Sequence, residues 1–175
     1  MAIYNGKHCV FEEVGVDSGA IEWNADTNVD DNSAYNDYNI SDMRTTTLPT
    51  KLLLLSSALQ SILTNTTIQT AKNGNSTSLV STSDKTFILA EKEMTGTRDC
   101  SVQQEFEALT TLNYWANHTN VSDRKKYDSS SIARAYWLRS PYSGYTGRAV
   151  RVIDGGGFAN FGADNSSRVS QCFAY

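Results

Sequence analysis

The sequence has few cysteines and no long apolar run. Its cysteines, Cys9, Cys100 and Cys172, are widely spaced and form no CxxC pair. We therefore expect neither a disulfide framework nor a zinc knuckle, and we interpret all three as buried thiols. The longest apolar stretch, Leu52 to Leu55, is far shorter than the roughly 20 residues of a spanning helix. No basic-then-apolar run opens the chain, so the sequence predicts neither a signal peptide nor membrane insertion.

Charge is also sparse, at 19% of the 175 residues, and neither sign forms a block. The balance of 15 Lys and Arg against 19 Asp and Glu gives a net charge of -4. Without a basic patch we expect no nucleic-acid partner. The length suits a single domain over residues 1–175 with a sizeable core.

The usual signatures of catalysis are missing. A nucleophile needs a neighbouring base, but the only histidines are His8 and His118. Neither lies near a Gly-x-Ser-x-Gly elbow. The run Gly155-Gly156-Gly157 lacks the spacing of a nucleotide-binding loop. The sequence therefore predicts no catalytic residue and no cofactor.

One acidic segment has part of the spacing of a calcium-binding loop. Asp26, Asn28, Asp30 and Asp37 fall at positions 1, 3, 5 and 12 of such a loop. Position 6 is Asp31 in place of the glycine that the turn needs, and position 12 is a short Asp in place of a bidentate Glu. We predict a solvated loop and no metal site.

The sequence pattern of the first two thirds of the chain predicts a hairpin followed by mixed helices and strands. Ile3 to Val14 is β-prone around the turn signal Asn5-Gly6, which favours a hairpin. Ser41 can cap a helix that runs through Arg44, and Pro49 ends it or opens the next one. The other expected elements are an exposed loop over 24–39, a helix over 52–63 lying on the sheet, strands over 64–70 and 86–90, a turn over 73–75 and a helix over 103–115.

The last third is rich in glycine, which favours short strands and turns. It offers two strands, over 149–153 and 169–173. We predict that the second joins the central sheet, next to the first or to the N-terminal hairpin. By alternation, Val150 and Val152 should point into the core and Arg151 outward.

The most distinctive motif is Tyr136-Trp137-Leu138-Arg139-Ser140-Pro141, followed by the strand candidate at the end of the chain. Trp137 and Leu138 are expected in the core. A buried guanidinium needs partners, so Arg139 should pair with backbone carbonyls or with a carboxylate. Candidate carboxylates are Asp42, Asp84 and Asp123, and the sequence does not choose among them.

With three further segments, this motif resembles a known family. The segments are Ile40-Ser41-Asp42-Met43-Arg44, Ser83 to Glu91, and Ser122-Asp123-Arg124-Lys125-Lys126-Tyr127. The chain resembles the C-type lectin-fold domain that often serves as the variable protein of diversity-generating retroelements. The resemblance runs from about Ile40 to the C-terminus, although Arg168 and Gln171 replace the usual glycine and proline. It implies an α+β, C-type lectin-like fold in which helices brace a twisted antiparallel sheet, with a loop-rich C-terminal module.

In such a protein the variable segment would cover about 142–168. Adenine mutagenesis of Asn codons, as the resemblance implies, cannot produce Lys, Glu, Gln, Met or Trp. None of these occurs from Tyr142 to Val169, although the chain holds 25 of them. A random window of that length would lack all five about once in 75 trials. An ordinary glycine-rich β region is the alternative.

The residues of this segment suit binding, because Tyr and Arg supply contact area and charged donors. Two aromatics, Phe158 and Phe161, would be costly if exposed without a contact role, and either could instead fill the core. The candidate ligand-binding residues are Tyr142, Tyr145, Arg148, Arg151, Asp154, Phe158, Asn160, Phe161, Asp164 and Asn165.

The resemblance implies recognition without turnover. The expected setting is a phage receptor-binding protein on the virion tail or a bacterial surface adhesin, which binds a protein or glycan on a cell as a monomer or homotrimer. Binding should not need calcium, because the chain lacks Glu-Pro-Asn and Trp-Asn-Asp tripeptides. Two alternatives stay open: a structural virion or cell-wall module without a variable face, and a formylglycine-generating-enzyme-like oxidase, which would need a copper-binding cysteine pair.

Overall fold

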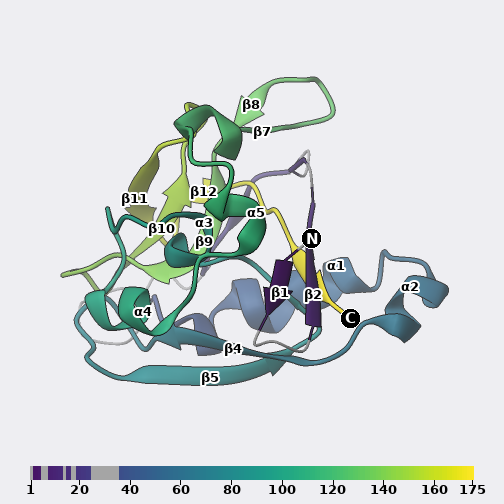
Figure 1. Cartoon of the computed structure of the whole chain (residues 1–175), viewed down its shortest axis with the longest axis horizontal. Coiled ribbons are helices and arrows are strands. Elements are labelled where there is room, and N and C mark those ends of the chain that lie inside the picture. Colours follow the sequence, from purple (N-terminus) through teal and green to yellow (C-terminus); the bar gives the residue numbers. More distant parts are fainter. Residues whose placement is uncertain (1, 5–7, 14, 17–18, 25–35) are drawn as a thin grey trace.

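The computed structural model describes residues 2–4, 8–13, 15–16, 19–24 and 36–175. It is a mixed α and β structure of small antiparallel sheets and short helices (Figure 1). The strands are β1 Ala2–Tyr4, β2 His8–Glu12, β3 Ile21–Glu22, β4 Thr66–Ala71, β5 Leu79–Asp84, β6 Thr86–Phe87, β7 Lys126–Tyr127, β8 Ala133–Arg134, β9 Tyr136–Pro141, β10 Arg148–Val152, β11 Phe158–Gly162, β12 Ser166–Ser167 and β13 Cys172–Ala174. The helices are η1 Tyr38–Ile40, η2 Met43–Thr47, α1 Leu48–Leu52, α2 Ser57–Ile62, α3 Glu91–Met94, α4 Gln103–Ala108, α5 Asn113–Ala116 and η3 Val121–Arg124.

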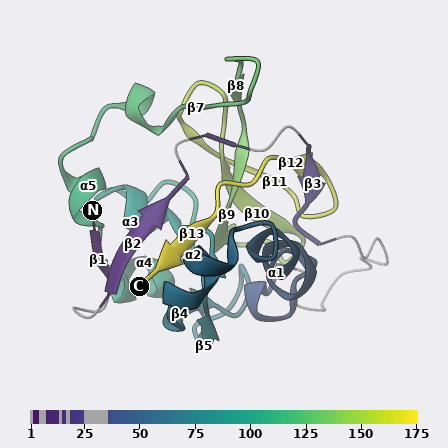
Figure 2. The same cartoon turned by 90° about the vertical axis from the view of Figure 1, so that its right-hand side faces the viewer.

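The two ends of the chain meet in one four-stranded sheet of order β1-β2-β13-β6. β1 and β2 form the predicted antiparallel hairpin, with Ile3 opposite Cys9; its turn signal lies outside the described residues. The predicted C-terminal strand is also confirmed, but it begins later, at Cys172. It pairs with β2, placing Ala174 opposite Val10, and with β6 (Figure 2).

A second sheet, β11-β10-β9, contains the Trp-Leu-Arg motif. Every residue of β9 is buried, and the expected core positions of Trp137 and Leu138 are confirmed, at 0% and 1% exposure. Val150 and Val152 are fully buried as well. Because apolar side chains of β9 and β10 leave water together, this sheet anchors the C-terminal third to the core.

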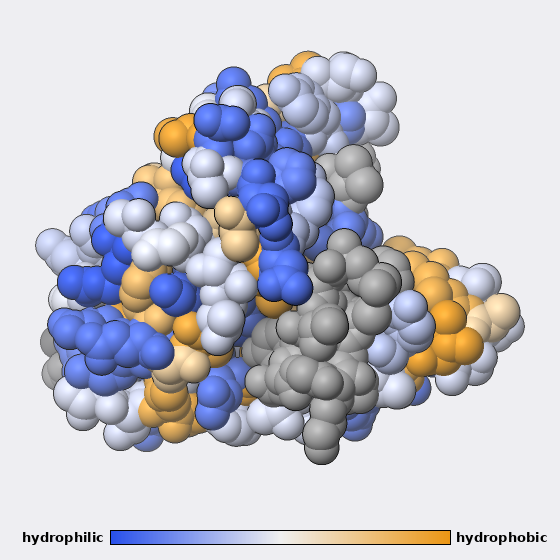
Figure 3. Space-filling model, viewed as in Figure 1, coloured by the Kyte–Doolittle hydropathy of each residue, from blue (hydrophilic) through white to orange (hydrophobic). Residues whose placement is uncertain are grey.

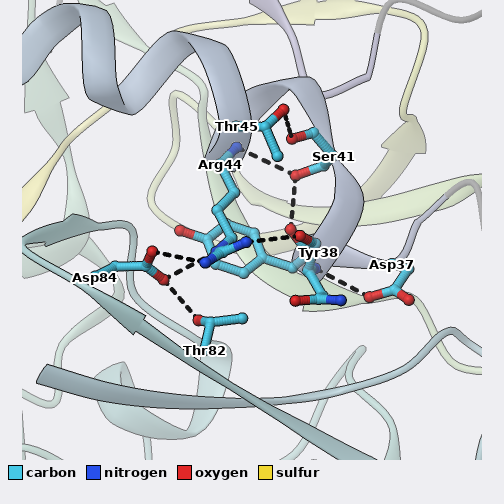
Figure 4. A network of polar contacts seen from close by, with 8 residues as sticks. Asp37, Tyr38, Ser41, Arg44, Thr45, Thr82 and Asp84 are labelled. Atoms are coloured by element: carbon cyan, nitrogen blue, oxygen red, sulfur yellow. Dashed lines mark hydrogen bonds and ion pairs between the residues drawn. The ribbon is translucent and has the colours of Figure 1, made fainter.

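The helix predicted at Ser41 forms, and an ion pair fixes it to the neighbouring hairpin. Ser41 Oγ accepts a hydrogen bond from the backbone N of Arg44. The Arg44 guanidinium forms two hydrogen bonds, 3.0 and 2.9 Å long, to Asp84 at the end of β5 (Figure 4). η2 is a π-helix that continues into α1, and Pro49 is the second residue of α1.

The prediction of one long helix over 52–63 is wrong. α1 ends at Leu52 and the separate α2 begins at Ser57, where the hydroxyl of Ser56 caps it. Leu53 and Leu54 are 73% and 80% exposed and do not lie on a sheet. Figure 3 shows apolar surface at the right-hand end of the molecule, where Figure 1 places α2.

Two further expectations need correction. The predicted helix over 103–115 is two helices, α4 and α5, because residues 109–112 leave the helix and the backbone N of Leu112 donates to the carbonyl of Glu93. The loop expected to be exposed over 24–39 ends in three buried residues, Asn36, Asp37 and Tyr38. The strand predicted over 64–70 and the turn predicted over 73–75 are confirmed as β4 and an Asx turn at Asn73. The strand predicted over 86–90 forms only at Thr86–Phe87, as β6, although residues 88–90 are buried.

Arg139 pairs with a carboxylate that sequence reasoning did not consider. Its terminal nitrogens donate to both oxygens of Glu93 at 2.6 Å, and both side chains are almost fully buried. The predicted pairing with backbone carbonyls is confirmed, because Arg139 also donates to the carbonyls of Ile88 and Gln69. Of the carboxylates that the sequence offered, Asp84 binds Arg44 instead. Local patterns do not reveal Glu93, because it lies 46 residues away on α3.

Buried Glu105 gives a testable pH dependence. Burial raises its pKa above the ordinary value of 4.5, so the folded state holds the proton more tightly than the unfolded state does. Its stabilising contribution is therefore full below pH 4.5 and is lost as the pH rises through the folded pKa. We expect E105Q, measured by thermal unfolding between pH 4 and 8, to lose less stability with rising pH than the parent.

The control for this prediction is E107Q, which changes an exposed carboxylate on the same helix. In E105Q, the amide oxygen can still accept the hydrogen bonds that Thr70 Oγ1 and Ala71 N give to the carboxylate. Parallel pH profiles for E105Q and the parent would contradict the raised pKa.

Candidate functional site

The segment 142–168 comprises the β9–β10 loop, the β10–β11 hairpin and the chain that leads through β12. In Figure 1 the hairpin lies on the left, away from α1 and α2 on the right. Of the ten candidate residues, Tyr145, Arg148, Asp154, Asp164 and Asn165 are exposed and the other five are half-buried.

A first group of candidates lies side by side on the β9–β10 loop and the adjoining strands. The rings of Tyr142 and Tyr145 are 5.3 Å apart, and the Arg148 guanidinium lies 5.3 Å from the Tyr145 ring. Arg148 also donates to Asn160 Oδ1 on β11 at 2.6 Å. Tyr145 is 54% exposed. These four residues form a continuous aromatic and polar surface, which we call the tyrosine–arginine cluster.

Arg151 and Phe161 form a second, separate group. The Arg151 guanidinium stacks 3.6 Å from the Phe161 ring, which lies 6.1 Å from the Trp137 ring. Burial lowers the pKa of Arg151, and the charge of Asp154 opposes that shift. Alternation along β10 puts Arg148 and Arg151 on opposite faces of the sheet. The ten candidates therefore do not lie together on one exposed face, contrary to our expectation that the others would join Arg151 there.

The remaining candidates divide between packing and exposure. Phe158 is half-buried against the core under the Arg124 guanidinium, 4.6 Å away, and Phe161 also packs against the core. Both rings therefore pack against the core, as the alternative interpretation expected, and neither is freely exposed. Asp154 accepts a hydrogen bond from Gly155 N, and Asp164 accepts one from Asn165 Nδ2.

Asn36 holds the β9–β10 loop through main-chain atoms. Its Nδ2 donates to the carbonyl oxygens of Tyr145 and Arg148, at 2.8 and 2.6 Å, and its backbone N donates to the carbonyl of Thr146. Asn36 is fully buried. Sequence reasoning missed it, because an Asn in an Asn- and Asp-rich stretch carries no local sign of burial.

Two other distant segments contact the same loop. Gly144 N donates to the carbonyl of Gly74 at 2.8 Å, and Ser143 N donates to that of Cys100 at 2.9 Å. A Cβ atom on Gly74 would lie 1.9 Å from the carbonyl oxygen of Tyr145, so only glycine allows this approach. The sequence identified the turn at Gly74 but not its contact with the loop.

The turn of the β10–β11 hairpin is also held by its main chain. Gly156 has φ +89, and a Cβ there would lie 2.0 Å from the carbonyl oxygen of Val121. Arg124 Nε donates to the carbonyl of Gly156 at 2.8 Å. The position therefore requires glycine both for its backbone angle and for its close neighbour.

The cysteines and the acidic loop lie only partly within the described residues. Cys172 is a buried free thiol, as expected, whereas Cys100 is a free thiol that is only half-buried. Partial burial raises the pKa of Cys100 to about 11. The Cys9 side chain lies outside the described part. So do Asp26, Asn28, Asp30 and Asp31, while Asp37 is buried. Over the described ranges, no three His, Cys, Asp or Glu side chains group as metal ligands, and no helix is long and apolar enough to cross a membrane.

Comparison with known proteins identifies a family without assigning an activity. A family model described as a domain of unknown function, DUF6273, matches residues 14–172. No curated protein and no solved structure matches the chain. The match covers the sheet β11-β10-β9 and the whole candidate segment, whereas β1 and β2 lie before it.

Proposed function

We propose that this chain, which belongs to the DUF6273 family of domains of unknown function, is a binding protein with a C-type lectin-like fold that presents residues 142–168 to a target. It acts by recognition, without a catalytic residue. The target is a protein or glycan on a cell surface, and the setting is a phage tail or a bacterial surface. Diversification of the segment by a retroelement belongs to the same proposal.

The main support is that residues outside the segment hold its main chain. Asn36, Gly74 and Cys100 contact backbone atoms of the β9–β10 loop. Arg124 and Val121 do the same at the hairpin turn. A hydrogen bond to a backbone carbonyl does not depend on the side chain of that residue. Exposed side chains of the segment can therefore change while the loop keeps its shape, as a diversified binding surface requires.

The chemistry of the tyrosine–arginine cluster also supports recognition. Two tyrosines supply rigid amphipathic area, and Arg148 and Asn160 supply donors and acceptors, a combination typical of paratopes. Arg148 is exposed and already oriented by Asn160 and the Tyr145 ring. Such pre-organisation reduces the entropy lost on binding. We assign the primary contact to this cluster and a flanking role to Arg151.

The double variant Y145A/R148A tests this assignment. Fluorescently labelled protein would be incubated with a panel of intact bacterial strains and with a glycan array. We expect the parent to bind at least one strain or glycan and the variant to lose that binding by tenfold or more. Each exposed substitution should change the free energy of unfolding by less than about 0.5 kcal/mol.

The matched control is Y127A/R134A, which removes the same residue types from β7 and β8, outside the segment. It should bind as the parent does, and binding should persist in EDTA. Absence of binding by the parent across the panel, or equal loss in both double variants, would overturn the proposal. Loss of binding in EDTA would overturn its calcium-free form.

A further inference from the structure

A cavity of about 250 Å³ lies beside α3, α5 and η3. These elements adjoin because the backbone N of Leu112, just before α5, donates to the carbonyl of Glu93 on α3. The cavity residues that matter here are Met94, Thr95, Thr111, Trp115, Thr119 and Arg124. All lie outside the segment 142–168, so the cavity is a feature separate from the proposed binding segment.

Arg124 lines this cavity and, among the described residues, has no ionic partner. The side chain is only 6% exposed. Its Nε donates to the carbonyl of Gly156, and the guanidinium stacks on Phe158. Among the described residues, no carboxylate pairs with it and its two terminal nitrogens donate to no acceptor. Arg139, the other deeply buried arginine, has Glu93 as its partner.

A buried guanidinium without a counter-charge is costly, and an anion that supplies two parallel acceptors would relieve that cost. A carboxylate has this geometry. A carboxylate also has the right charge, because one arginine balances one negative charge. A doubly charged phosphate would leave one negative charge uncompensated inside the cavity. The charge of Arg124 therefore favours a monocarboxylate over a phosphate.

The other walls of the cavity indicate what accompanies the carboxylate. Met94 and Trp115 are buried apolar side chains. Thr111 Oγ1 donates to the carbonyls of Lys92 and Thr95 and so keeps lone pairs free to accept. Thr95 Oγ1 accepts from Thr97 N and keeps its own O–H as a donor. Hydroxyls beside an aromatic wall suit a ring that bears hydroxyl groups.

We propose that this cavity binds a small monocarboxylate the size of an acidic monosaccharide, with the terminal nitrogens of Arg124 on its carboxylate. Through the Arg124–Gly156 hydrogen bond and the Phe158 contact, the site adjoins the hairpin turn of the segment 142–168. Its volume, below the roughly 300–1,000 Å³ typical of pockets for drug-sized ligands, limits it to small ligands.

The test titrates full-length protein with sodium glucuronate and follows the Trp115 indole N–H by NMR. Glucose serves as the probe with a similar ring but no carboxylate, and inorganic phosphate as the probe with more charge. We expect saturable shifts with glucuronate and at least tenfold weaker binding of glucose and phosphate. Absence of saturable shifts, or equal binding of glucose, would overturn the proposal; tighter binding of phosphate would overturn the monocarboxylate assignment.

Two variants locate the site. R124Q should weaken glucuronate binding tenfold or more. Because Arg124 also holds Gly156, A116L provides an independent block: Ala116 is exposed at the cavity and lies on α5. A108L, at the exposed end of α4, is the matched control and should bind as the parent does. Parent-like binding by folded A116L, or equal loss in A108L, would place the ligand elsewhere.

Discussion

Replacing Arg139 by methionine should lower the free energy of unfolding by about 3–5 kcal/mol, because it leaves Glu93 as a buried, unpaired carboxylate. The pair is 0% and 1% exposed. Arg139 also donates to the carbonyls of Gln69, within β4, and Ile88, just after β6, so one side chain connects α3, β9, β4 and the segment that follows β6. Urea denaturation of the parent and R139M, followed by circular dichroism, measures the change.

Two companion variants separate the charge from the packing. The double variant R139M/E93L removes both charges and should recover part of the loss. R134M breaks the partly exposed pair between Arg134 and Asp128, in which the arginine side chain is 38% exposed, and should cost less than R139M, about 1 kcal/mol. Similar losses in R139M and R134M would show that burial does not determine the strength of the Arg139 pair.

The second large effect is expected at Trp137. Its side chain is fully buried, its Nε1 donates to the carbonyl of Ile21 at 2.8 Å, and its ring lies 6.1 Å from Phe161. W137A creates a large cavity, which typically costs about 3–5 kcal/mol. The thermal midpoint should therefore fall steeply and the second sheet should loosen.

Y145A is the comparison for this variant. It also removes an aromatic ring, but one that is 54% exposed, so its midpoint should stay close to that of the parent. Binding to a cell or glycan target should respond in the opposite order, with Y145A impaired at a temperature where it is fully folded. Equal destabilisation by W137A and Y145A would place Tyr145 in the core.

Local sequence patterns predicted those elements that depend on neighbouring residues. The N-terminal hairpin, the cap at Ser41, the strand at β10 and the buried Trp137 each follow from a turn signal, a capping hydroxyl or a run of β-branched residues. The C-terminal strand was also predicted, but β13 is three residues long, whereas a strand of five residues was expected. These features need no information from distant parts of the chain.

Features decided by distant contacts were not predicted. The leucines after Leu52 have helical spacing, but the chain turns at 53–56 and leaves Leu53 and Leu54 in solvent. Glu93 was not considered as the partner of Arg139, because only the tertiary fold brings α3 to β9. The binding candidates were drawn from one segment, yet the strand geometry divides them between two faces, and their main-chain supports, Asn36 and Gly74, come from far outside it.

The position of β13 has a consequence for how the protein is made. β2 is synthesised well before its partner strand at residues 172–174, so Val10 cannot pair until Ala174 is available. Contacts at such sequence separation slow folding, because the loop between them must close first. A nascent chain cannot complete the first sheet until residues 172–174 have left the ribosome. Until then, the edge of β2 that pairs with β13 in the folded protein has no partner strand, and a strand of another chain can hydrogen-bond to it.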